Sequence, residues 1–190
     1  MIIKNQIVLF TFKTLDSYTE QIFNNDFNKG GIENAETKSK YNTRFNYSKK
    51  ATYKEIKTAE INTELDTIIG NKRFIELTIT PKRKINKLEF ITKTELALNQ
   101  FKVNDVLVNK GRKYSVKNGT FLVYHLSNSD TEVTLSFTID VNEKLAIILN
   151  EISYDLLTNK NFNLTPRTEE MMPMPFVTND AIIVSKKLKL

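Results

Sequence analysis

Alternation of apolar and polar residues is the clearest pattern in this chain, and it is concentrated between residues 72 and 140. The run from Val133 to Ile139 places an apolar side chain at every second position, which is typical of a strand with one buried and one solvated face. Turn-forming residues separate the runs of this kind: Pro81, Lys110-Gly111, Asn118-Gly119 and Asn128. The pattern predicts that residues 72–140 form one antiparallel β domain.

The chain before residue 72 alternates less regularly. Residues 2–12 are rich in β-forming side chains and predict a strand. A capping-box pattern at residues 17–20, followed by apolar residues at helical spacing, predicts a helix that ends at Gly30-Gly31. Residues 58–69 predict a second, short helix, whose apolar side consists of Ile61, Leu65, Ile68 and Ile69.

The last third of the chain has two distinct parts. The apolar residues of segment 143–157 fit both a helix and a hairpin strand, and their spacing slightly favours the helix. Further on, Pro166, Pro173 and Pro175 hold the chain extended and exclude a helix, and residues 181–184 predict a last strand. We expect residues 161–190 to pack on another subunit, because methionine and aromatic side chains rarely remain exposed on a linker. The expected contact residues are Met171, Met172, Met174, Phe176, Ile182 and Val184.

These elements together predict a β-rich α+β fold. Its core would be an antiparallel β-sandwich or barrel, with one to three short helices and extended terminal and loop arms. A length of 190 residues suits one domain with a substantial core and extensions. We expect a single domain over residues 1–160 with a long basic loop at residues 32–57, followed by a Pro/Met-rich arm with a last strand at residues 161–190.

Composition removes several classes of chemistry. The chain has no cysteine, which excludes disulfides and thiolate metal sites, and its single histidine, His125, has no acidic sequence neighbour that could orient it as a general base. Neither a nucleophile elbow nor a glycine-rich phosphate loop occurs. We therefore expect no enzyme, cofactor, metal site or small-molecule substrate. The apolar runs are too short for a membrane span and the start does not resemble a signal peptide, so we expect a cytoplasmic, non-membrane protein.

The net charge of +6 is concentrated between residues 38 and 57, where seven Lys and Arg residues face one carboxylate, Glu55. Lysines can neutralise phosphates while aromatic rings stack on bases, so this segment could bind nucleic acid. The same side chains suit an acidic protein surface, and a plain solvated loop is a third interpretation. The candidate contact residues are Lys38, Lys40, Tyr41, Arg44, Phe45, Tyr47, Lys49, Lys50, Tyr53 and Lys54.

Glu55 and Lys57 also have the Glu-x-Lys spacing of metal-dependent nucleases. In such enzymes the carboxylate holds the metal ion and the lysine stabilises developing charge. A nuclease core also needs an aspartate on a preceding strand, whereas residues 41–54 have the composition of a loop. The nuclease hypothesis is therefore the weakest of those considered.

Residues 101–114, Phe-Lys-Val-Asn-Asp-Val-Leu-Val-Asn-Lys-Gly-Arg-Lys-Tyr, resemble a small β-hairpin of carbohydrate-binding modules and of phage fibre and baseplate proteins. Asn104 replaces the usual glycine, and the chain has no tryptophan, so sugar binding is not implied. In overall character, with no cysteine, one β-rich core and long arms, the chain resembles the small connector, ring or tail-completion proteins of low-GC tailed bacteriophages.

That resemblance implies a structural subunit of a virion, made and assembled in the host cytoplasm. Its partners would be copies of itself and other structural proteins of the same assembly, contacted through the extended arms. The alternative is a nucleic-acid-binding accessory protein that holds DNA with segment 38–57. A metal-dependent nuclease is the third hypothesis.

Overall fold

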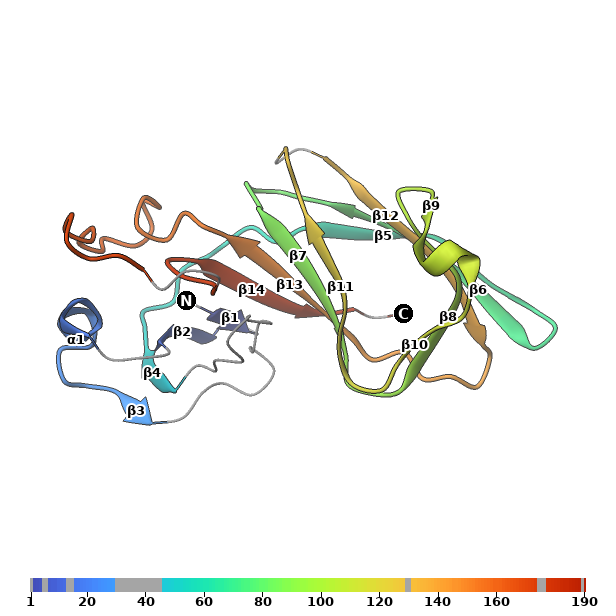
Figure 1. The fold of residues 1–190 in the computed structure, drawn as a ribbon, viewed down its shortest axis with the longest axis horizontal. Coiled ribbons are helices and arrows are strands. Elements are labelled where there is room, and N and C mark those ends of the chain that lie inside the picture. Colours follow the sequence, from blue (N-terminus) through green and yellow to red (C-terminus); the bar gives the residue numbers. More distant parts are fainter. Residues whose placement is uncertain are drawn as a thin grey trace. The chain divides into compact units, whose positions relative to one another are not determined.

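The computed structural model describes residues 2–4, 7–12, 16–29, 46–128, 131–173, 177–188 and 190. The chain divides into two compact units, whose elements are labelled in Figure 1. Unit 1 consists of residues 1–56 and 151–186, and unit 2 of residues 57–150 and 187–190. This division differs from the predicted single domain over residues 1–160 with a separate arm, because the segment after residue 160 belongs mostly to unit 1.

Unit 2 contains two groups of strands. One is a sheet in the order β10-β8-β12-β6-β5, with β9 also paired to β8, and the other has the order β11-β7-β13. The bounds are β5 Glu60–Ile69, β6 Lys72–Thr80, β7 Lys87–Thr92, β8 Leu96–Val103, β9 Val106–Leu107, η1 (a 3-10 turn) Val108–Gly111, β10 Tyr114–Val116, β11 Gly119–His125, β12 Val133–Asp140 and β13 Ile147–Ser153. The prediction of a β-rich α+β fold with antiparallel sheets is confirmed, and the form is sandwich-like and not a closed barrel.

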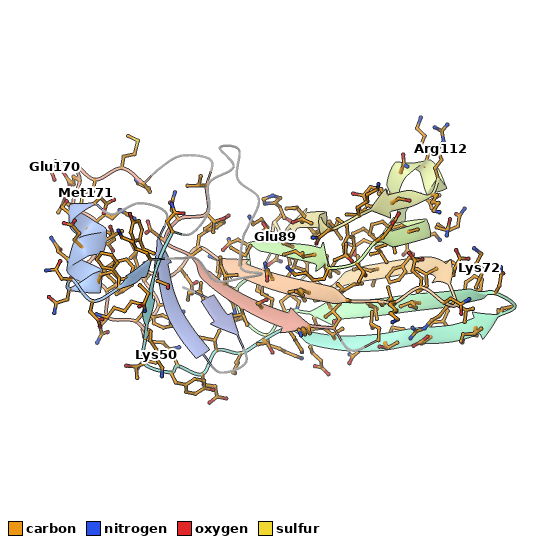
Figure 2. All side chains as sticks on the ribbon, turned by 90° about the horizontal axis from the view of Figure 1, so that it is seen from below. Lys50, Lys72, Glu89, Arg112, Glu170 and Met171 are labelled. Atoms are coloured by element: carbon orange, nitrogen blue, oxygen red, sulfur yellow. The ribbon has the colours of Figure 1, made fainter. Side chains whose placement is uncertain are left out.

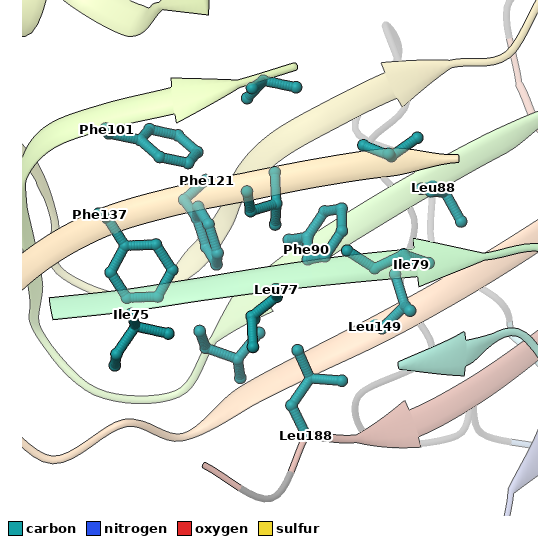
Figure 3. Close-up of a cluster of buried hydrophobic side chains, with 14 of the residues drawn as sticks. Ile75, Leu77, Ile79, Leu88, Phe90, Phe101, Phe121, Phe137, Leu149 and Leu188 are labelled. Carbon is teal, nitrogen blue, oxygen red and sulfur yellow. The ribbon is translucent and has the colours of Figure 1, made fainter. Parts of the chain in front are cut away.

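The core of unit 2 is filled by apolar side chains from both groups of strands. Phe101 of β8 lies 6.2 Å from Phe121 of β11 and 6.3 Å from Phe137 of β12, measured between ring centroids. Figure 3 shows these rings among leucine and isoleucine side chains of β6, β7 and β13. On β12 every second side chain is buried, as the alternation predicts. Burying one such ring contributes on the order of 1.5–3 kcal/mol, so this core is the main source of stability of unit 2.

Two sequence-based helix predictions are wrong. Residues 60–69 form strand β5, which pairs antiparallel with β6 across the two-residue turn Gly70-Asn71. Residues 147–153 form strand β13 instead of the favoured helix, and all seven are buried. A strand buried on both faces lacks alternation, so its apolar spacing cannot be told from that of a helix.

Two turn predictions also need correction. Asn118-Gly119 does not close a hairpin, because β10 pairs with β8 whereas β11 pairs with β7. Lys110-Gly111 likewise does not close a hairpin, because β9 and β10 both pair with β8; the hairpin in residues 101–114 is that of β8 and β9, with the turn Asn104-Asp105 at φ of 47° and 64°. Positive φ at both turn residues matches the right-handed twist of the flanking strands, and asparagine tolerates it where glycine is usual.

Unit 1 combines a short helix with a sheet in the order β13-β14-β1-β2-β4-β3. The bounds are β1 Ile2–Lys4, β2 Ile7–Phe12, α1 Ser17–Phe23, β3 Asn28–Lys29, β4 Tyr47–Lys50 and β14 Ile182–Lys187. The helix begins after Asp16, whose carboxylate accepts the backbone N–H of Thr19 at 2.8 Å while the Thr19 hydroxyl accepts the backbone N–H of Asp16. It ends at Phe23, before the predicted Gly30-Gly31, because Asn24 takes a left-handed conformation with φ of 50°.

The last strand lies in the chain's own sheet. β14 pairs in parallel with β1, with Ile183 opposite Ile2, and it also adjoins β13. The backbone groups of β14 therefore find partners within the chain. This contradicts the prediction that the last strand adds to the sheet of another subunit.

Candidate interaction surfaces

Strand β5 is the outermost strand of the β10-β8-β12-β6-β5 sheet and pairs only with β6. Nine of its ten residues are exposed. About half of the N–H and C=O groups of an edge strand point away from the sheet and can pair with another chain. A ten-residue edge is long for a strand that has only solvent beside it, and β5 is therefore the first candidate surface.

The end of the β5–β6 hairpin is apolar. Ile68 is 58% exposed and Ile69 is 65% exposed, and Val141 is exposed beside them, with its N–H bonded to the Asn71 carbonyl at 3.0 Å. Two ion pairs flank this apolar tip, and the first joins Lys72 to Asp140. Lys72 is labelled at the end of the hairpin in Figure 2. An apolar centre with a charged rim is the usual composition of a protein–protein contact.

A second ion pair joins the two strands of the hairpin. The Arg73 guanidinium makes a bidentate contact with the Asp66 carboxylate, with N–O distances of 2.7 and 2.6 Å. These hydrogen bonds lower the pKa of the Asp66 carboxyl below its ordinary value. Because Arg73 and Asp66 both lie toward the tip, the pair stiffens the outer part of the hairpin.

The opposite edge of the same sheet is formed by β9, η1 and β10. It has exposed apolar residues at Val106 and Leu107, and its charged residues are mostly basic. Figure 2 shows the side chain of Arg112 pointing outward from this edge. The exposed basic residues are Lys110, Arg112, Lys113 and Lys117. This edge is the second candidate surface.

The basic-aromatic segment, residues 38–57, includes a strand. Residues 47–50 form strand β4, which pairs with β2 and β3, so the predicted loop at residues 32–54 is wrong there. Tyr47 packs edge-on against Phe27 at 5.5 Å, and the Lys49 ammonium donates to the Phe23 carbonyl at 2.7 Å and lies 3.6 Å from Asp26. These two residues therefore support unit 1 itself.

The rest of the segment has mixed outcomes. Lys50, Tyr53 and Lys54 are exposed, as a contact surface requires; Lys50 is labelled in Figure 2. The remaining candidates lie outside the described residues: Lys38, Lys40, Tyr41, Arg44 and Phe45. Of the five candidates that the structure describes, three are exposed and two, Tyr47 and Lys49, are half-buried.

The C-terminal segment is fastened to unit 1. The Arg167 guanidinium makes two 3.0 Å hydrogen bonds to the Asp180 carboxylate and stacks 4.3 Å above the Tyr18 ring, while the Tyr18 hydroxyl donates to the Thr165 carbonyl at 2.7 Å. Burial raises the pKa of Tyr18 above its ordinary value, and the nearby Asp180 carboxylate adds to this shift. Thr165 and Arg167 therefore contact helix α1 through Tyr18, and Arg167 is tied to Asp180, which contradicts a separate arm at these residues.

The six predicted subunit-contact residues differ in their burial where the structure describes them. Ile182 and Val184 are buried with Leu156 and Phe162 in the core of unit 1, so the prediction for these two residues is wrong. Met171 is half-buried and Met172 is 86% exposed. Met174 and Phe176 lie outside the described residues. Among the described members of the predicted contact set, Met172 is the one that is fully accessible.

The side chains considered for catalysis are exposed. Glu55 and Lys57 lie on the segment between β4 and β5, and His125 lies at the end of β11. The described residues contain no cluster of three or more His, Asp or Glu residues that could hold a metal ion.

The hairpin edge was missed from the sequence although a signal for it exists. Gly70-Asn71 lies between two runs rich in Ile and Thr, and Gly-Asn between such runs is typical of a two-residue hairpin turn. Gly70 has a φ of 62°, as this turn requires. The helical spacing of Ile61, Leu65 and Ile68 concealed it.

Comparison with known proteins adds no relative. No protein-family model matches the chain, and no curated protein matches it significantly. No helix within the described residues has the length and apolar character needed to cross a bilayer.

Proposed function

We propose that this protein is a structural subunit of a large assembly, of the ring, connector or tail-junction kind found in tailed-phage particles. The observation that carries the proposal is strand β5, a ten-residue edge with nine exposed residues and an apolar tip. Monomeric proteins usually protect such an edge with a covering loop or helix, with lysines or with proline. β5 carries a bulge between Thr63 and Leu65 and three carboxylates, which give some protection, but it has no lysine or proline and nine of its ten residues are exposed. This exposed edge favours pairing with another chain.

The composition of unit 2 supports the same proposal. Its apolar side chains form one buried cluster, and its outermost strands include β5, β10 and β11, without a metal-type cluster in the described residues. A sandwich with accessible sheet edges suits a building block better than an enzyme. The phage setting rests on the resemblance of the whole chain, in overall character, to small connector, ring or tail-completion proteins of tailed phages, and it implies the virion as the protein's location.

The proposal is tested by the mass and the shape of the purified full chain. We expect light scattering to give a mass several times 22.0 kDa at micromolar concentration, and negative-stain electron microscopy to show particles of uniform size. A single species of 22.0 kDa at every concentration would contradict self-assembly.

A second function, nucleic-acid binding, rests on the exposed Lys50, Tyr53 and Lys54. Phosphate contacts predict an affinity that falls steeply with salt concentration. Gel-shift titration with single- and double-stranded DNA at two salt concentrations tests it, with Lys50→Ala/Lys54→Ala as the variant. If this surface binds DNA, the variant should weaken binding and reduce its salt dependence.

A further inference from the structure

We propose that copies of this chain join head to tail, with the β5 edge of one copy paired to the β10 edge of the next. This inference deepens the proposed function by naming the two surfaces that meet, and it rests on that function. Both edges belong to the same sheet of unit 2 and are its two ends, β10-β8-β12-β6-β5. Joining them would continue one sheet from copy to copy.

Charge favours this pairing over pairing of β5 with itself. β5 carries three carboxylates and no basic residue. Glu60 and Asp66 are paired with Lys82 and Arg73, so Glu64 is the carboxylate of this strand without an ion pair among the described residues. The segment around β10 carries exposed Arg112, Lys113 and Lys117. Like charges opposite one another on neighbouring strands are destabilising, whereas opposite charges are stabilising. Two copies of β5 side by side would oppose acidic residues, while β5 beside β10 would oppose acidic and basic residues.

The direction of the strands is also compatible. Four antiparallel pairings separate β10 from β5: β10 with β8, β8 with β12, β12 with β6, and β6 with β5. An even number of reversals leaves β5 and β10 running in the same direction. Copies related by rotation about an axis along the strands would therefore pair β5 and β10 in parallel, and such a head-to-tail contact can close into a ring.

The register across the sheet places Lys113 and Asp66 at about the same position along the strand direction, which is called their height below. Thr67 of β5 pairs with Phe74, Phe74 with Thr138, and Thr138 with Asn99. Asn99 is the neighbour of Leu98, which pairs with Tyr114 of β10. Rotation about an axis along the strands keeps these heights. Lys113 of one copy would then lie at about the height of Asp66 and Thr67 of the next, without a shift along the strands.

Charge reversal tests the pairing. The first variant, Glu64→Lys/Thr67→Lys, makes the middle of β5 locally basic, because the carboxylates of Glu60 and Asp66 stay paired with Lys82 and Arg73. The second, Arg112→Glu/Lys113→Glu, places two glutamates on the stretch of the β10 edge that would face those lysines. All four positions are exposed, so circular dichroism should show both variants folded. Light scattering should show that each alone loses assembly, with the apparent association constant reduced at least about tenfold. Equimolar mixing should restore it, because each basic edge then meets an acidic one; carrying all four substitutions in one chain should do the same.

The outcomes separate this inference from the proposed function. If the wild type assembles and either variant assembles equally well, the head-to-tail pairing is overturned while the structural role stands. If mixing does not restore assembly, the pairing is likewise overturned. A wild type that remains a monomer overturns both.

A cysteine pair gives an independent readout, because the chain has no cysteine of its own. Thr67→Cys and Lys113→Cys in one chain should give a ladder of disulfide-linked species on a non-reducing gel, since the register places these two residues opposite one another and pairing would bring their Cα atoms within about 4.4–6.8 Å. Either substitution alone should give no ladder and no dimer. A dimer formed by Thr67→Cys alone would indicate pairing of β5 with β5 and would overturn the proposal.

Discussion

Lys87 and Glu89 form an ion pair inside unit 2, with 2.8 Å between Nζ and Oε1. They lie two residues apart on β7, where the lysine side chain is 8% exposed and the glutamate side chain 1%. Each charge is shielded from water and depends on the other for its stabilisation. Removing one partner from a buried pair leaves an uncompensated charge, which costs more than the pair itself contributes.

We therefore expect Glu89→Ala to lower the free energy of unfolding by about 3–5 kcal/mol. The matched control is Glu60→Ala, which removes the exposed pair with Lys82 and should cost at most about 1 kcal/mol. Urea unfolding followed by circular dichroism measures both. Equal, small effects of the two substitutions would show that the buried pair is not shielded from water.

Asn150 is the second unusual polar residue of the core. Its side chain is fully buried, and neither its amide oxygen nor its amide nitrogen has a hydrogen-bond partner among the described residues. Asn150→Leu should therefore raise the free energy of unfolding by about 1–3 kcal/mol, because the desolvation cost of the amide disappears. Asn150→Asp should lower it, because it adds a buried charge. A leucine variant that unfolds at a lower urea concentration than the wild type would contradict this prediction and would show that the Asn150 amide is hydrogen-bonded.

Tyr18 should make the stability of unit 1 depend on pH in the alkaline range. Its pKa is raised above 10.0, chiefly by burial. The folded state thus holds the phenol proton more tightly than the unfolded state. The resulting stabilisation is fully present below about pH 10 and is lost as the pH rises through the folded pKa. The melting temperature should therefore fall at alkaline pH, and this fall should be smaller in Tyr18→Phe. At neutral pH the same variant should lose about 1 kcal/mol of unfolding free energy, because the hydrogen bond to the Thr165 carbonyl is missing.

The last strand should be required for folding. β14 lies between β13 and β1, and Leu188, just after it, is buried in the core of unit 2. Deleting residues 182–190 should abolish the β signal in circular dichroism or lower the melting temperature sharply. Met172→Ser, at an exposed position, is the control and should change the free energy of unfolding by less than about 0.5 kcal/mol. A truncated chain that remains folded but fails to assemble would restore the arm hypothesis.

Much of the sandwich could be predicted from alternation because its strands have one buried face. β12 is the clearest case, and Pro81 follows the end of β6 as expected. β5 could not be predicted this way, since a bulge between Thr63 and Leu65 interrupts its alternation and its side chains are exposed on both faces. Its structure comes from pairing with β6, which outweighs local spacing.

The candidate surfaces were harder to predict than the fold. Exposure of Tyr53 and Lys54 follows from the polar composition of their segment. The roles of Tyr47 and Lys49 depend on Phe27 and Phe23, which lie twenty or more positions away in the chain. The position of Ile182 beside β1 likewise depends on a pairing between the two ends of the chain. Local patterns in a single sequence cannot predict such contacts, because the contacting residues lie far apart in the chain.

If β5 is an assembly surface, the substitution Leu65→Lys on this strand should prevent assembly. Leu65 is 43% exposed on β5, and a lysine there would block the edge and repel the basic edge of a neighbour. The matched control is Val123→Lys on β11, where the valine is 39% exposed. Light scattering should show that Leu65→Lys stays at 22.0 kDa while the wild type and Val123→Lys form the same larger species. A Leu65→Lys chain that assembles as the wild type does would contradict the account.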